Sequence, residues 1–151
     1  MSKTKLNSGQ SLFELVLSFA VVTLIVVGIV SAATIAIRNA AYSRNKTLAD
    51  RYLQEALEWL RSEKNKNYTD FQSHTSISQW CLKSLDSDWV WIGAICQPGQ
   101  EITGTMMRRE LTFSKFTKDG KEVIETKVVV YWTDAQGRHE SSAVTDFTNW
   151  Q

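Results

Sequence analysis

Residues 15–37, LVLSFAVVTLIVVGIVSAATIAI, form an uninterrupted run of 23 residues without a charge, and this run decides the fold. As an α-helix it is about 34 Å long at 1.5 Å per residue, whereas the hydrocarbon core of a bilayer is about 30 Å thick. A cleaved secretory signal has an apolar region of only about 7–15 residues that ends at a small-residue cleavage site. The run therefore predicts a membrane-spanning helix that stays attached to the protein.

The charged residues of the chain are balanced and dispersed. Its 17 Lys and Arg against 16 Asp and Glu give a formal net charge of +1, and the basic residues form no block, so we predict no contact with nucleic acid. No group of residues has the pattern of a catalytic site, and two cysteines with the distant His74 and His139 lack the spacing of a zinc site. We expect a protein that is not an enzyme and that holds no metal or cofactor.

The short segment before the apolar run is polar. Residues 1–9, MSKTKLNSG, contain Lys3 and Lys5, and the following residues 10–14, QSLFE, end on Glu14. A charged side chain in a membrane helix costs about 2.5–3.5 kcal/mol at mid-bilayer and less near the edge, so Glu14 is a candidate for a functional role. The alternative is that Glu14 only marks the start of the helix, where the helix dipole favours a carboxylate.

This segment resembles the class III signal of type IV prepilins, in which a short basic leader ends in Gly and a Glu stands five residues into the mature chain. Gly9, Gln10 and Glu14 occupy those positions. The resemblance implies that a prepilin peptidase cuts between Gly9 and Gln10 and can methylate the new amino group of Gln10, where the family usually has Phe or Met. It also implies that Glu14 pairs with the terminal ammonium of a neighbouring subunit, because two buried charges are tolerable only when matched.

The orientation of the chain in a membrane follows from the resemblance. Basic residues flank the apolar run on both sides, so the positive-inside rule does not distinguish the two orientations. The resemblance implies that the leader, residues 1–9, lies in the bacterial cytoplasm, that residues 10–37 cross the inner membrane once, and that residues 38–151 form an extracytoplasmic head. The chain would later move into a pilus or pseudopilus. The implied partners are other pilins, the prepilin peptidase, the inner-membrane assembly platform and, before assembly, membrane lipid.

The helical pattern continues beyond the apolar run. Ala49, Leu53, Ala56 and Leu60 follow an i, i+4, i+7, i+11 spacing with polar residues between them, which is the pattern of an amphipathic helix. We predict one helix from residue 11 to about 64, whose second half packs against a head.

The C-terminal third has the pattern of an antiparallel sheet. Within residues 108–150 we predict three strands, at 109–116, 123–132 and 139–147, and an Asp-Gly turn joins the first two. Residues 65–107 are predicted to be a variable loop region. The predicted class is α+β, and the resemblance implies the ladle of type IV pilins, a long helix packed on a small antiparallel sheet.

Further segments restrict the resemblance to one group within the type IV prepilins. They are Arg108-Arg109, KVVVYW at 127–132, Gly137-Arg138, Thr148-Asn149-Trp150 and LQEALEWLR at 53–61. These segments look like those of minor pilins of the pilus-modification type and of the related minor pseudopilin of type II secretion.

Three hypotheses about function follow. The first is a structural minor pilin that assembles into, primes or modifies a type IV pilus-like filament. The second is a minor pseudopilin of a type II secretion or DNA-uptake machine, which the neighbouring genes would distinguish from the first. The third is a single-pass membrane-anchored enzyme or binding domain. The lack of a catalytic pattern argues against the enzyme, and Gly9 with Glu14 argues against a simple anchor.

Cys81 and Cys96 are the only two cysteines, and both lie in the predicted head. Outside the cytoplasm oxidation is favoured, and closing a loop of about 15 residues contributes about 3 kcal/mol in the chain-entropy model. We predict a Cys81–Cys96 disulfide, and two free thiols are the alternative. Trp89 and Trp91 alternate along the chain, so their rings should share a face, which is a candidate subunit contact if it is solvated.

Overall fold

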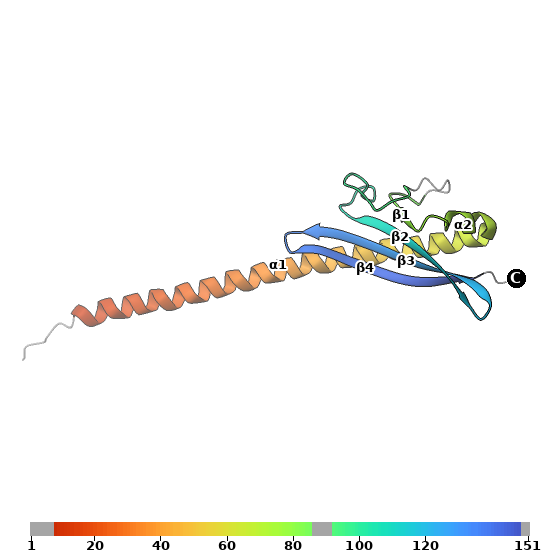
Figure 1. The fold of residues 1–151 in the computed structure, drawn as a ribbon. Helices are drawn as coiled ribbons and strands as arrows, with labels where there is room; N and C mark the ends of the chain where they lie inside the picture. The colour runs from red at the N-terminus through yellow and green to blue at the C-terminus, as the bar shows by residue number, and fades with distance from the viewer. Residues whose placement is uncertain (1–7, 86–91, 149–151) are drawn as a thin grey trace, which may run out of the picture. The chain divides into compact units, whose positions relative to one another are not determined.

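The structure, a computed structural model, describes the backbone of residues 8–85 and 92–148 (Figure 1). Its elements are α1 (Ser8–Lys66), α2 (Tyr68–His74), β1 (Gln79–Cys81), β2 (Arg108–Lys118), β3 (Lys121–Asp134) and β4 (Gly137–Thr148). The α+β class predicted from the sequence is confirmed. Contacts within the chain divide it into two units, Met1–Ser43 and Arg44–Gln151.

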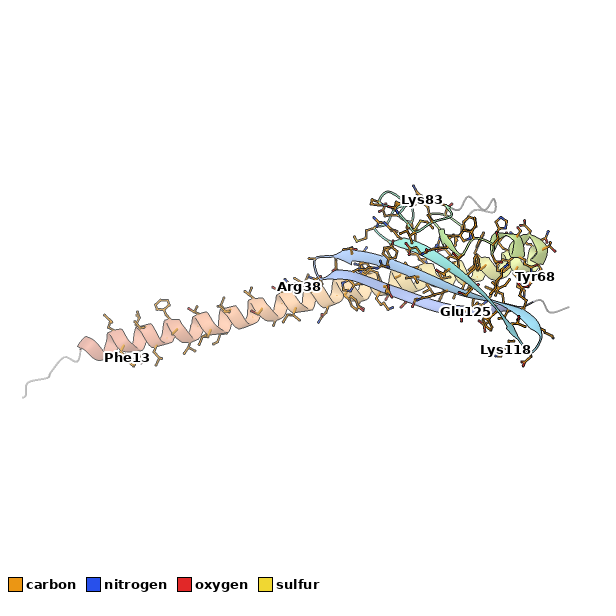
Figure 2. All side chains as sticks on the ribbon, in the orientation of Figure 1. Phe13, Arg38, Tyr68, Lys83, Lys118 and Glu125 are labelled. Atoms are coloured by element: carbon orange, nitrogen blue, oxygen red, sulfur yellow. A yellow bond between two sulfur atoms is a disulfide. The ribbon has the colours of Figure 1, made fainter. Side chains whose placement is uncertain are left out.

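The apolar part of α1 makes up the first unit. Every side chain from residue 12 to 43 is exposed (Figure 2), and α1 is long and apolar enough to cross a membrane. Three hydroxyl groups donate hydrogen bonds to carbonyl oxygens one turn earlier, Ser18 to Glu14 (2.8 Å), Thr23 to Phe19 (2.7 Å) and Thr34 to Val30 (2.9 Å). Since polar groups in lipid must find their partners within the protein, these three hydroxyls suit a lipid environment.

In the second unit, the C-terminal part of α1 packs against the sheet (Figure 1). Ala49, Leu53, Ala56 and Leu60, the predicted apolar stripe, are at most 6% exposed and share one core cluster with the inner face of the sheet. The predicted long helix is thus confirmed, and it extends a few residues beyond both predicted ends.

The sheet is antiparallel throughout, with the strand order β1-β2-β3-β4. Every second residue of β3 from Ile124 to Trp132 faces the helix and is at most 1% exposed. The predicted Asp-Gly turn joins β2 to β3, where Asp119 has φ 52° and Gly120 has φ 75°. Two successive positive φ values are those of a type I′ turn, whose twist matches that of the flanking strands.

Residues 65–107, predicted to be a variable loop region, contain the end of α1 and also α2 and β1. The sheet has four strands instead of the three predicted. The side chain of Asn67 caps α2 by accepting a hydrogen bond from the Asp70 N–H (3.1 Å). Phe71 lies against Phe113 and Phe147, with ring centroids 5.9 and 5.3 Å apart. Elements of seven and three residues are too short to show a periodicity.

Candidate assembly site

Glu14 lies on α1, six residues after the helix begins at Ser8. Its side chain is exposed, and no ion pair joins it to another side chain that the structure describes. The effect of the helix dipole falls off within the first turn, and Glu14 lies beyond that turn. A role as a mere marker of the helix start therefore explains Glu14 poorly.

The surroundings of Glu14 on the helix form a shallow groove along one face. The residues that line it are Glu14, Leu15, Ser18, Phe19 and Val22. Because residues four apart lie above one another on a helix, this face is continuous over two turns. It offers one carboxylate beside apolar side chains, which suits an apolar helix that carries a cation at its end.

The predicted cleavage bond, between Gly9 and Gln10, lies in the first turn of α1. Gln10 and Glu14 are four residues apart, about 6 Å along a helix. An amino group created at Gln10 would therefore lie at the same end of the helix as the carboxylate.

A disulfide joins Cys81, at the end of β1, to Cys96, with their Cα atoms 4.9 Å apart. The Cys96 N–H donates a hydrogen bond to Glu110 Oε1 (2.9 Å), which also accepts one from the Tyr131 hydroxyl (2.9 Å). The disulfide and these bonds hold the segment around Cys96 against the strands. The pairing is the one predicted from the sequence.

Two groups of residues that the sequence singled out lie outside the described residues. They are Trp89 and Trp91, and Asn149-Trp150 of the C-terminal segment that resembles minor pilins. The subunit contact at Trp89 and Trp91 stays a prediction.

Arg109 is the feature that the sequence analysis missed. Its side chain is 2% exposed. The Arg109 Nη1 donates a hydrogen bond to the Tyr52 carbonyl oxygen of α1 (3.1 Å) and lies 3.9 Å from Glu55 Oε2. The Arg109 Nε has no hydrogen-bond partner in the described part of the chain. Burial lowers the pKa of Arg109 to about 10, and the Glu55 carboxylate opposes that shift. A signal was present, because Arg109 shares the inward side of β2 with Leu111 and Phe113.

Arg109→Met is expected to raise the free energy of unfolding of the full chain in detergent micelles by about 1–2 kcal/mol. A pKa of about 10 means that the buried site, with the opposing effect of Glu55 included, disfavours the charged form by about 3 kcal/mol. Methionine fills similar space without a charge, and the lost hydrogen bond to Tyr52 offsets roughly 1.5 kcal/mol of the gain. Denaturant unfolding at pH 7 measures the difference.

Two further measurements distinguish charge from packing at Arg109. Arg109→Ala removes the same charge but leaves a cavity, so it should be less stable than Arg109→Met by about 2 kcal/mol or more. Above about pH 10 the folded chain loses the Arg109 proton before the unfolded chain does, so the advantage of Arg109→Met should shrink as pH rises. A methionine variant less stable than the wild type at pH 7, or an advantage unchanged above pH 10, contradicts the cost assigned to this charge.

Comparison of the chain with protein-family models found no match, and comparison with curated proteins and with solved structures found none either.

Proposed function

We propose that this chain is a structural minor pilin, a subunit that assembles into, primes or modifies a type IV pilus-like filament. The observation that carries the proposal is an exposed apolar helix, continuous with the helix of a folded head, whose Glu14 has no ion-pair partner among the described side chains. A single-pass anchor would also need the apolar helix, but it would have no use for Glu14.

The apolar part of α1 has to be shielded from water. Its sixteen large apolar side chains between residues 12 and 37 are each 49–73% exposed, and leaving them in water would cost on the order of 20 kcal/mol. Lipid covers them while the chain is in a membrane. Once the chain leaves the bilayer, only other apolar helices can take the place of lipid, and a filament core of packed helices provides them.

The cleavage position, the head and Glu14 each match a part of a pilin subunit. Gly9 and Gln10 provide the cleavage position of a prepilin, and the cut leaves α1 attached to the head. The head combines the second half of α1 with a small antiparallel sheet, as the pilin ladle requires. Pairing of Glu14 with the ammonium of the next subunit would set the axial register of the filament.

Processing is the first test of the proposal. The intact mass of protein from cells that contain a prepilin peptidase should show the loss of residues 1–9, and the formal charge should change from +1 to −1 because Lys3 and Lys5 leave. The same chain from cells without the peptidase should keep its full mass.

Two glycine variants provide a matched pair for this measurement. Gly9→Ile places a branched side chain next to the cut and should block cleavage. Gly28→Ala should be cut like the wild type, because a Cβ at Gly28 meets nothing within 4 Å. An uncut wild-type chain in cells with the peptidase, or a cut after Ala33, contradicts the prepilin assignment.

A further inference from the structure

The second unit contains a groove between α1 and the loop that precedes β2. Its volume is about 560 Å³, and the residues that line it are Arg44, Asn45, Leu48, Gly104, Thr105, Met106 and Met107. Met106 is 61% exposed, whereas its neighbour Met107 is 2% exposed. The groove therefore has an exposed apolar side chain, that of Met106, and a basic side chain, that of Arg44, among the residues that line it.

Backbone hydrogen bonds hold the loop that presents Met106. The Ile102 N–H donates to the Met107 carbonyl oxygen (2.8 Å), and the Thr105 N–H donates to the Ile102 carbonyl oxygen (3.0 Å). The Thr105 hydroxyl donates to the same carbonyl oxygen of Ile102 (2.8 Å). Since Met107 is anchored in the core, the exposure of Met106 is a fixed property of the turn.

The part of α1 that leads to this groove has basic residues and no acidic residue before Asp50. Between Glu14 and Asp50 the sequence has no acidic residue, whereas Arg38, Arg44 and Lys46 are basic. Lys46 forms an ion pair with Asp50 at 3.3 Å. Arg44 forms no ion pair with any side chain in the described residues, so its charge is available to an anion.

The position of Arg44 in the chain indicates where that anion lies. Arg44 follows the end of the apolar run at Ile37 by seven residues, about 10 Å along α1. Long side chains on a helix point back toward its N-terminus, which here is the side of the apolar run. The polar layer of a bilayer is about 5–7 Å thick on each side, so the guanidinium can reach lipid phosphates.

We propose that this groove binds the headgroup of an anionic phospholipid, with Arg44 paired to the phosphate and Met106 set into the interface. The inference rests on the membrane-spanning part of the proposed function and goes beyond it by naming a ligand. The Arg44 guanidinium, the one basic group among the residues that line the groove, is complementary to a phosphate. A second copy in a symmetric contact would instead bring two Arg44 side chains together, and like charges repel.

Hydrogen exchange on the full chain in lipid nanodiscs, one chain per disc, tests this site. In discs with anionic phospholipid, the amides of residues 103–107 should exchange about fivefold more slowly than in zwitterionic discs, the factor expected for one basic residue at an anionic surface. Arg44→Gln should remove the difference. Lys118→Gln, which removes the same charge from the exposed end of β2 (Figure 2), should keep it.

Any other result contradicts the lipid site, and the results that follow can be told apart by the explanation that each supports. Equal exchange in the two lipids, for a chain inserted in the discs, overturns the lipid site and leaves the proposed function standing. Protection only in discs with two chains assigns the groove to a second copy, and protection by inorganic phosphate in zwitterionic discs assigns it to a soluble anion. A chain that does not insert into discs overturns the spanning helix, and with it both proposals.

Discussion

Glu14→Leu is expected to be processed and retained in the inner membrane, and to be absent from sheared filaments. Leucine is better solvated by lipid than a carboxylate, so membrane insertion should become easier. In a filament, the ammonium of the neighbouring subunit would enter an apolar core without its partner, at a cost of about 3–5 kcal/mol. This cost corresponds to a loss of incorporation by roughly two to more than three orders of magnitude.

The membrane and filament fractions of one culture, quantified separately, provide this measurement. Thr34→Ala is the matched control, because Thr34 lies outside the groove that includes Glu14 and its hydroxyl already bonds to its own helix. The control should enter filaments at about the wild-type level. If Glu14→Leu does so as well, the pairing role is wrong and the helix-start interpretation of Glu14 is favoured.

Loss of the disulfide is expected to have the largest effect on the stability of the head. Replacing Cys81 and Cys96 by Ala opens a loop with a sequence separation of 15 residues, which should lower the free energy of unfolding by about 3 kcal/mol. For a head of this size the melting temperature should fall by roughly 10 °C. Thermal unfolding of the mature chain in detergent micelles measures both.

Treatment with a reducing agent distinguishes the effect of losing the disulfide bond from the effect of replacing the two cysteine side chains. The wild type should lose about the same stability when it is reduced, whereas the double Ala variant should not respond. A wild type whose melting temperature is unchanged by reductant, or quantitative alkylation of Cys81 and Cys96 without reduction, contradicts the predicted disulfide.

Features of the fold that depend on local pattern could be predicted from the sequence. The apolar run has the length of a membrane-spanning helix, and the stripe ending at Leu60 has the period of a helix. Asp119 and Gly120 adopt the positive φ that their turn requires. The short α2 and β1 could not be predicted, because their stability comes from residues distant in sequence. Phe71, for example, is buried against β2 and β4.

The same distinction applies to the candidate sites. The exceptional position of Glu14 is visible in the sequence, because a single acid beside a charge-free run is a local feature. The buried Arg109 depends on a contact with Tyr52, 57 residues away. The groove between Arg44 and Met106 likewise needs two segments that only the fold brings together.

The filament fraction itself tests the central claim most directly. Filaments sheared from cells that express the chain at its natural level should be purified and analysed by intact mass and quantitative mass spectrometry. The proposal predicts this chain in the filament fraction, beginning at Gln10, at a small fraction of the amount of the main subunit. A chain found only in the membrane fraction, or one that still carries residues 1–9 in the filaments, would contradict it.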